Sequence, residues 1–255
     1  MTVKDLYAAL EARIPRALSC EWDNDGLMCC PDAEKTVERV LVALDITAEV
    51  VKQAIEGGYD LIVSHHPLVF RPLKSVNPLD AVANKVIRLL CAGVSAMSFH
   101  TRLDAVSGGV NDALANSLGL REVTPFGNEG EEIGRIGFLE RKMTVKEFAE
   151  AVKTATGAPA VTVSDGGVDV YRVAVLGGSG SDDVLAARAA GADTYLSGEL
   201  GHHFLTDCPE WHMNLVAAGH FYTENLVCRV LKEMLLEIDP SLRVTISNSN
   251  RVQIL

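Results

Sequence analysis

A strand–helix–strand plan occurs twice in this 255-residue chain, and the repeat constrains the fold more than any other feature. Three pairs of identical residues are separated by the same 133 positions: Arg39 and Arg172, Gly58 and Gly191, and Ser64 and Ser197. Any two strand–helix–strand units place small and apolar residues in similar positions, but that likeness does not explain a constant offset. We infer an internal duplication.

Continuous apolar runs alternate with helical periods along the chain. Strands buried on both faces read as such runs, and they are expected at 40–45, 60–64, 94–99, 172–177 and 191–197. Apolar residues at helical spacing predict helices at 2–13, 48–56, 80–91 and 182–190, the first with Thr2 as N-cap. This alternation predicts an α/β fold with largely parallel strands, built from two similar α/β domains related by the duplication.

The division between the two domains is expected near residue 124. Residues 123–136 are polar and rich in turn formers, which makes them the best candidate for a linker. The first domain is then expected over residues 1–124 and the second over 125–255. Residues 243–246 and 252–255 read as short strands, and the segment from about residue 220 can return to pair with the first domain.

Bulk properties exclude several classes of protein. The net charge of −11 disfavours a nucleic-acid binder, although bound metal ions would reverse the local field and admit an anionic ligand. The six cysteines form no C-x-x-C pair, which indicates a reducing, cytoplasmic setting. The N-terminus opens an amphipathic helix rather than a signal peptide, and no apolar run reaches the ~18 residues of a membrane span. We expect a soluble protein.

Three histidine segments each follow an apolar run, and two of them have an acid four residues after the histidine. They are His65-His66-Pro67, His100 with Asp104, and His220 with Glu224. Because ligands gather beyond the carboxyl ends of strands in such sheets, the three segments are expected to converge in a cleft there. Imidazole and carboxylate are the usual ligands of zinc, iron, manganese or nickel. Four imidazoles and two carboxylates suffice for two divalent ions.

Each of these residues alone also has an ordinary explanation. Asp104 can cap the helix that begins near Gly108, and Glu224 can favour a helix N-terminus. The histidine pair before Pro67 can lie in an ordinary loop. The case for a metal site rests on the recurrence of histidine and acid at duplicated positions.

Further polar residues and glycines keep more than one reading. His202 and His203 could be ligands, supports of ligands or substrate contacts, whereas His212 lacks an acid partner and reads as structural. Asp45 ends a strand and could orient a ligand histidine by a hydrogen bond. The segment 177–181 is glycine-rich and could cradle an anion or form a plain tight turn, but it matches neither a P-loop nor the Rossmann glycines.

The chain resembles, nearly from end to end, the NGG-interacting-factor-three-like family, also known as dinuclear-metal-centre hexameric proteins or type 2 GTP cyclohydrolase I. The motifs that carry the resemblance occur in this order: Trp22-Asp23-Asn24-Asp25-Gly26-Leu27, Leu44-Asp45-Ile46-Thr47, Ser64-His65-His66-Pro67, His100-Thr101-Arg102-Leu103-Asp104, Gly108-Gly109-Val110-Asn111-Asp112, Ser197-Gly198-Glu199 and Gly219-His220-Phe221-Tyr222-Thr223-Glu224.

The resemblance implies a ligand set for two divalent ions per subunit. The ligands are His65, His66, Asp104, His220 and Glu224, with Glu224 able to bridge both ions. His100 then lies beside the ions as a candidate general acid/base. Arg102 departs from the family, which usually has Asn there, and could add an anion contact or alter the pocket. The resemblance also implies the short form of the family, without an inserted middle domain, and a toroidal homohexamer.

Two functions from different classes are consistent with these residues. The leading one is a dinuclear metal-dependent hydrolase acting on a nucleotide or related small metabolite, and the resemblance suggests GTP cyclohydrolase I-like ring opening. Two ions about 3.5–4 Å apart can acidify a shared water. The alternative is a non-enzymatic metal-binding scaffold or regulatory protein. Five ligands are few for two ions, which favours open coordination positions and hence chemistry.

Overall fold

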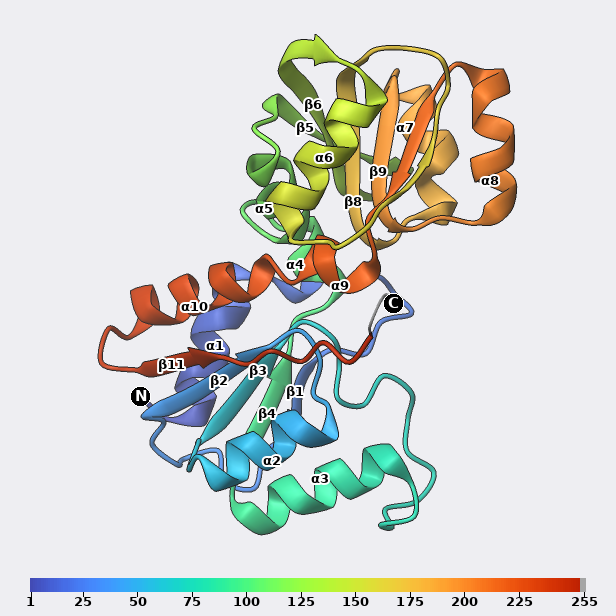
Figure 1. The fold of residues 1–255 in the computed structure, drawn as a ribbon. Helices are drawn as coiled ribbons and strands as arrows, with labels where there is room; N and C mark the ends of the chain where they lie inside the picture. The colour runs from blue at the N-terminus through green and yellow to red at the C-terminus, as the bar shows by residue number, and fades with distance from the viewer. Residues whose placement is uncertain (253–255) are drawn as a thin grey trace. The chain divides into compact units, whose positions relative to one another are not determined.

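The computed structural model describes residues 1–252 and divides into two compact units, each an α/β sandwich around one sheet (Figure 1). The first unit comprises Met1–Val106 and Val227–Arg251, and the second is built on Ser107–Leu226. The predicted α/β fold is confirmed. The chain leaves the first unit after Val106, earlier than the expected boundary at 124, and returns to it after Leu226.

The sheet of the first unit has the strand order β1-β4-β3-β2-β11. Four strands run parallel, and β1 is antiparallel to β4 at the edge. The strands are β1 (Gly26–Cys29), β2 (Arg39–Ala43), β3 (Leu61–Ser64), β4 (Ser95–Ser98) and β11 (Arg243–Ile246). The helices are α1 (Val3–Arg13), α2 (Ala48–Glu56), α3 (Ala81–Ala92), α4 (Thr101–Ala105) and α10 (Val227–Ile238), with the short 3₁₀ turn η1 (Arg16–Leu18).

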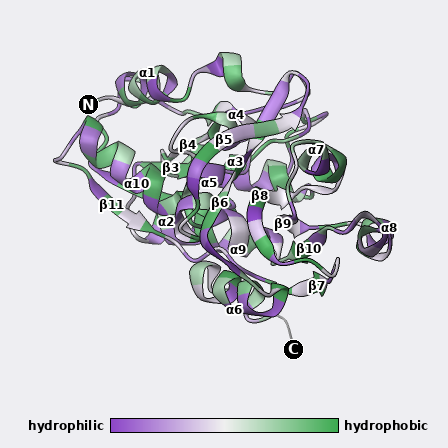
Figure 2. Ribbon diagram, turned by 90° about the horizontal axis from the view of Figure 1, so that it is seen from above, coloured by the Kyte–Doolittle hydropathy of each residue, from purple (hydrophilic) through white to green (hydrophobic). Residues whose placement is uncertain are grey.

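Helices cover both faces of this first sheet. In Figure 1, α2 and α3 lie on one face and α1 and α10 on the other. Apolar residues of α2 and α3 pack against β2, β3 and β4 in one core cluster that includes Val51, Leu89 and Ile62. Alternating green and purple stretches along α1 and α10 in Figure 2 mark their amphipathic character. Burial on both faces explains the unbroken apolar runs of the strands.

Helix ends follow the expected signals. Thr2 forms a capping box with Asp5 at the start of α1, which confirms it as the N-cap. Asp80 accepts hydrogen bonds from two backbone N–H groups at the start of α3, and Gly93 ends that helix in the left-handed conformation (φ 68°). The helix predicted at 48–56 coincides with α2.

The second unit carries a six-stranded sheet of order β5-β6-β8-β9-β10-β7. Its strands are β5 (Arg121–Asn128), β6 (Glu131–Met143), β7 (Thr162–Ser164), β8 (Val170–Ser179), β9 (Thr194–Glu199) and β10 (Asn214–Ala217). Helices α5 (Val110–Ser117) and α6 (Val145–Thr156) cover one face, and α7 (Val184–Ala189) and α8 (His202–Asp207) the other. Its short elements are η2 (Ser181–Asp183), η3 (Cys208–Trp211) and α9 (His220–Glu224).

The predicted linker at 123–136 is wrong. This segment forms the antiparallel pair β5 and β6, joined at Gly130, which has a φ of 83°. As the edge strand, β5 exposes most of its residues to solvent, so it can be polar without losing its place in the sheet. Turn-forming residues serve a hairpin as well as a linker, and composition did not separate the two.

The two units repeat one plan, as the constant offset predicted. The parallel strands β2, β3 and β4 correspond to β8, β9 and β10, and α4 corresponds to α9. Asp60 accepts hydrogen bonds of 3.0 Å from the backbone N–H groups of Glu38 and Arg39. Asp193, its counterpart 133 residues later, accepts from the equivalent two groups at 3.0 and 2.7 Å. A shared side-chain contact at the same offset supports duplication.

The C-terminal segment returns to the first unit. The strand predicted at 243–246 is β11, which pairs in parallel with β2. The strand predicted at 252–255 lies, from Gln253 onward, outside the described residues.

All six cysteines are free thiols. Burial raises the pKa of Cys29 to about 11 and that of Cys228 to about 12, so both remain protonated at neutral pH. Within residues 1–252, none of the helices combines the length and the apolar character needed to cross a membrane.

Candidate metal centre

Two strand ends position the predicted residues of the first unit. β3 ends at Ser64, directly before His65 and His66, and β4 ends shortly before His100 and α4. The parallel register sets Ser64 opposite Ser98, so both segments leave the sheet at the same edge. This is the carboxyl edge, where α/β sheets usually bind ligands.

Three imidazoles meet at this edge of the first unit. The ring centroids of His65, His66 and His100 are 4.8, 5.2 and 5.6 Å apart, pair by pair. Each ring offers a nitrogen within 4.8 Å of the nitrogens of the other two, so the group could hold a metal ion. His65 is fully buried, and the other two are partly exposed.

In all three histidines the Nδ1 atom faces an acceptor that carries no hydrogen. The pairs are His65 with the carbonyl oxygen of Phe99 (3.0 Å), His66 with Asp45 (2.7 Å), and His100 with Asp23 (2.9 Å). These contacts assign the proton to Nδ1 and leave the lone pair on Nε2. Metal-binding histidines are commonly held in this way. Asp45, which the sequence suggested could orient a ligand histidine, contacts His66 in this way.

Asp104 is buried beside the imidazole of His65. Its Oδ1 lies 3.6 Å from Nε2 of His65, longer than a hydrogen bond but suitable for two atoms that contact one cation. Its alternative reading as a helix cap does not hold, because the N-cap of α5 is Gly109 and no side chain caps that helix. The donor set of the first unit therefore fits a metal ion.

Asp23 holds both the ring and the helix start at His100. Its second carboxylate oxygen accepts from the backbone N–H and the hydroxyl of Thr101, at 3.0 and 2.7 Å. Burial alone would raise the pKa of Asp23, but hydrogen bonds from His100 and Thr101 outweigh it and hold the pKa well below its usual value. Asp23 therefore stays a carboxylate and acts only as an acceptor.

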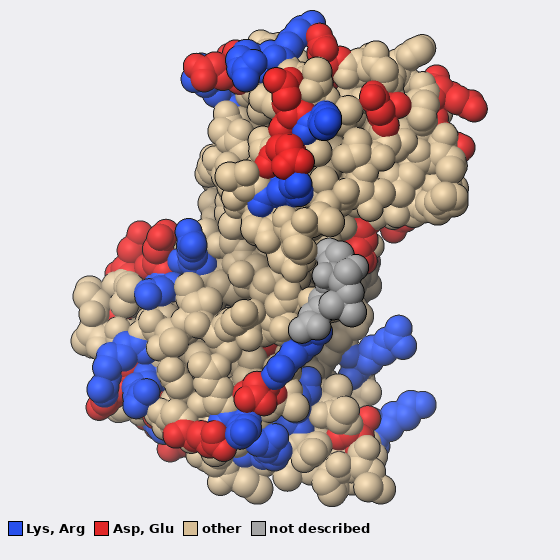
Figure 3. Space-filling model, in the orientation of Figure 1, with Lys and Arg blue, Asp and Glu red and all other residues tan. Residues whose placement is uncertain are grey.

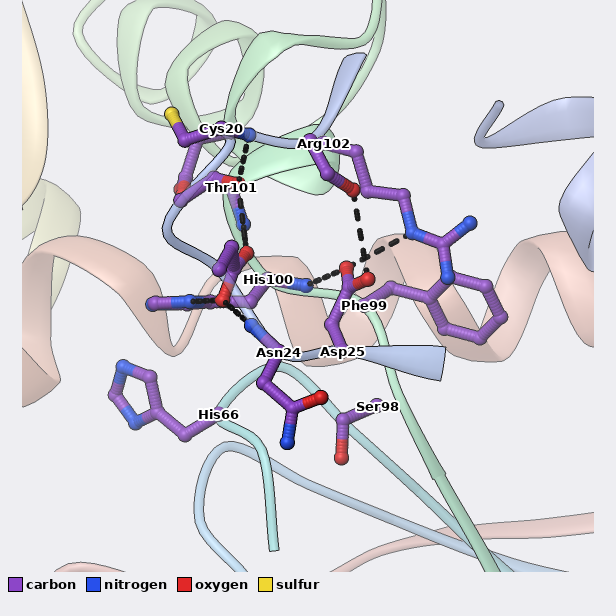
Figure 4. A network of polar contacts seen from close by, with 12 residues as sticks. Cys20, Asn24, Asp25, His66, Ser98, Phe99, His100, Thr101 and Arg102 are labelled. Atoms are coloured by element: carbon purple, nitrogen blue, oxygen red, sulfur yellow. Dashed lines mark hydrogen bonds and ion pairs between the residues drawn. The ribbon is translucent and has the colours of Figure 1, made fainter. Parts of the chain in front are cut away.

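Asp25 and Arg102 fix the backbone of the same segment. Asp25 accepts from the backbone N–H of His100 at 3.0 Å and from Nε of Arg102 at 2.8 Å (Figure 4). Arg102 is fully buried, also donates to Glu11 and to the carbonyl of Ile14, and stacks over a phenylalanine ring. Its guanidinium therefore ties α4 to α1, and the anion contact considered for it does not fit this position.

In the second unit, His220 and Glu224 are the first and last residues of the short helix α9. Four residues apart on a helix, they face the same side, and Nε2 of His220 lies 3.0 Å from Oε2 of Glu224. Nδ1 of His220 lies 3.6 Å from Glu199, a residue of β9. Gly219 precedes the helix with a φ of 88°, a conformation that favours glycine.

Three glycines make room for these two side chains. The pairing of β8 with β9 shifts register after Leu176, at Gly177 and Gly178. A Cβ atom on Gly177 would lie 3.0 Å from Cγ of Glu224, and one on Gly178 would lie 3.1 Å from Nε2 of His220. A Cβ on Gly198 would lie 2.8 Å from Cα of His220. The glycine-rich segment thus continues β8 and seats α9, a role that neither sequence reading foresaw.

A Gly178→Ala variant is expected to displace Glu224, because the new methyl group would overlap its carboxylate. Gly58→Ala is a matched control, since Gly58 also has a positive φ (62° against 71°) but no atom within 4 Å of the position that a Cβ would take there. Both variants should lose about 1 kcal/mol of stability from the backbone conformation. Only Gly178→Ala should also weaken metal binding by the second unit. Equal metal affinity of the two variants would contradict this role of Gly178.

The remaining predicted histidines lie elsewhere. By the 133-residue offset, His65 and His66 correspond to Gly198 and Glu199 rather than to the second histidine pair. Three histidines have exposed side chains and belong to no group of three potential ligands within residues 1–252: His202, His203 and His212.

The duplicated α/β fold, with imidazole and carboxylate groups at its strand ends, places the chain among α/β proteins with a candidate metal site. Comparison with protein families then assigns the chain. It belongs to the Duf34/NIF3 (NGG1p interacting factor 3) family, whose model matches residues 1–252. The family resemblance inferred from the sequence motifs is confirmed.

Similar proteins support this assignment over most of the chain. A Clostridium acetobutylicum protein named "GTP cyclohydrolase 1 type 2 homolog" is 33% identical and covers 88% of this chain and 85% of its own. A Methanocaldococcus jannaschii protein of the same name is 32% identical, over 92% and 95%. Among solved structures, reduced HcgD from Methanocaldococcus jannaschii has a TM-score of 0.82, with 30% identity over 96% and 97% of the chains. Staphylococcus aureus SA1388 has a TM-score of 0.89, with 26% identity over 100% and 99%.

Proposed function

We propose that this protein is a dinuclear metal-dependent hydrolase that acts on a nucleotide or a related small metabolite. The ligands in this proposal are His65, His66 and Asp104 of the first unit and His220 and Glu224 of the second, with Glu224 shared by two ions. Relatives are named "GTP cyclohydrolase 1 type 2 homolog". The family resemblance suggests opening of the guanine imidazole ring of GTP, in which one water opens the ring at C8 and a second water releases formate.

The orientation of the three imidazoles in the first unit carries this proposal. Each Nδ1 faces an oxygen acceptor, so each Nε2 presents a lone pair, and these atoms gather at the carboxyl edge of the sheet. A cluster of imidazoles that served only packing would not need every ring fixed in the same tautomer. The buried carboxylate of Asp104 supplies negative charge beside them, which a divalent cation would neutralise.

Divalent ions at such a site would supply Lewis acidity, which lowers the pKa of a bound water and polarises a substrate. His100 is the proposed general acid/base. Its Nδ1–H donates to Asp23, so Nε2 can take a proton from the attacking water and return it to the leaving group. The ionised Asp23 would stabilise the imidazolium that forms in between.

The decisive experiment combines metal analysis with a substrate screen. Protein purified without added metal should contain up to about two divalent ions per chain. Nucleotides and related metabolites are then tested for turnover with the wild type and with Glu224→Gln. A fully folded, metal-free protein that binds no added divalent ion would contradict the proposal. Metal binding without turnover of any compound would favour the non-enzymatic scaffold instead.

The proposal includes an assembly and a location. A toroidal homohexamer is implied by the family resemblance, and light scattering should then give six times the mass of the chain. A smaller mass at micromolar concentration would contradict it. The cytoplasm is the proposed compartment, since the free thiols suit a reducing environment.

A further inference from the structure

A cavity opens on the first unit beside the imidazole cluster. It has a volume of about 650 Å³, within the range of small-molecule sites, and it is lined largely by the segment that joins β3 to α3. The lining residues that matter here are Pro67, Phe70, Arg71, Lys74, Asp80 and Lys85. None of them belongs to the proposed metal ligands.

The lining of this cavity is basic although the chain carries a net charge of −11. Three cationic side chains and one carboxylate line it, and that carboxylate, Asp80, already accepts two backbone N–H groups at the start of α3. In Figure 3, basic side chains project from the right-hand side of the first unit, where Figure 1 shows the segment that joins β3 to α3. A basic cavity in an acidic protein selects for an anion.

Lys85 is the most firmly held of the three cations. It is partly buried, and its ammonium group donates to the carbonyl oxygen of Ile46 at 2.7 Å. Burial lowers the pKa of Lys85, while Asp45 and Asp80 act in the opposite direction. An anion in the cavity would further favour the charged ammonium. Because Asp45 also holds His66, Lys85 lies close to the support of the imidazole cluster.

Phe70 connects the cavity with the imidazole cluster. Its ring lines the cavity and stands edge-on to the ring of His100, with the centroids 6.0 Å apart, and to that of Trp22, at 6.1 Å. Phe70 and Trp22 remain 44% and 59% exposed. A small molecule held in the cavity can therefore extend along an apolar edge to the imidazoles.

We propose that this cavity binds the anionic group, in the first place a phosphate, of the small molecule that reacts at the imidazole cluster. Arg71, Lys74 and Lys85 are its cationic contacts, and Phe70 is the wall along which the rest of the molecule lies. Arginine and lysine together suit a phosphate, one through paired N–H donors and the other through a point charge. The assignment to a substrate rests on the proposed function, but anion binding itself does not require the metal ions.

The test is calorimetric titration of metal-free protein with inorganic pyrophosphate at low ionic strength. The double variant Arg71→Gln/Lys74→Gln should bind about tenfold more weakly than the wild type, and Lys85→Met at least about threefold more weakly. The matched control is Arg141→Gln/Lys146→Gln, which removes the same charge from a cavity of about 430 Å³ that is also lined by Glu147 and Glu150. The control should stay within about twofold of the wild type. An equal loss in both double variants, or no wild-type binding at millimolar pyrophosphate, overturns the proposal.

Because the titration uses metal-free protein, its result does not depend on whether the proposed metal ligands bind an ion. A second comparison identifies the source of the anion. A nucleoside diphosphate should bind at least as tightly as pyrophosphate, because its remaining atoms can contact Phe70. Tighter binding of free orthophosphate than of either compound would overturn the assignment to a substrate.

Discussion

A Glu224→Gln variant is expected to lose both metal ions, whereas Asp104→Asn should chiefly lose one. In the proposed centre Glu224 is shared by the two ions, and a neutral amide is a much weaker ligand than a carboxylate. Removing a ligand should weaken metal binding by at least about 10- to 100-fold, the range seen for supporting residues alone. Elemental analysis after gel filtration measures the metal-to-chain ratio for each variant.

The control for this pair is Glu210→Gln, which makes the same chemical change at an exposed position of the second unit. It should retain the metal content of the wild type. Circular dichroism of the metal-free variants checks that each remains folded. An equal, partial loss of metal in Glu224→Gln and Asp104→Asn would show that Glu224 does not bridge two ions.

An Asp23→Asn variant is expected to reduce turnover by about 10- to 100-fold while the protein stays folded. The amide can donate a hydrogen bond to Nδ1 of His100, which would move the imidazole proton to Nε2 and remove the lone pair needed there. Nitrogen-15 chemical shifts of His100 in metal-free protein report this tautomer without any substrate. Turnover is measured with the compound that the nucleotide screen identifies.

Asp60→Asn serves as the control for Asp23. Asp60 is likewise a carboxylate that accepts two backbone N–H groups, but it lies at the opposite end of β3 from the histidines. It should leave both the tautomer of His100 and the turnover unchanged. If Asp23→Asn keeps the proton on Nδ1 and the wild-type rate, Asp23 does not position His100.

Much of the fold could be predicted because buried parallel strands leave a strong signal. The strand expected at 60–64 is β3, which begins one residue later, at Leu61, and ends as expected. The helix expected at 48–56 coincides with α2. Hydrophobic residues on both faces of a strand produce an unbroken apolar run, and amphipathic helices produce a helical period. The hairpin of β5 and β6 was missed because an edge strand exposes much of its surface and therefore reads as a loop.

The candidate ligands could be predicted because their chemistry is restricted to few residue types. The residues that orient these ligands could not be predicted in the same way. Asp23 and His100 are 77 residues apart in the chain, and their hydrogen bond exists only because the loop before β1 packs against the end of β4. Acidic residues in a polar loop are common, so Asp23 and Asp25 stood out only as part of a family motif. Gly177 and Gly178 looked like a turn, since the side chains they accommodate lie on another element.

The sequence by itself determined the duplicated α/β plan, the placement of histidines after strands and the family. These features depend on local periodicity and on residue type, which a linear pattern records. Only the tertiary structure decided which nitrogen of each imidazole carries the proton, that Arg102 is buried in support of α4, and that a basic cavity lies beside the cluster. Hydrogen-bond direction and cavity shape depend on side chains distant in the chain, and folding alone brings these into contact.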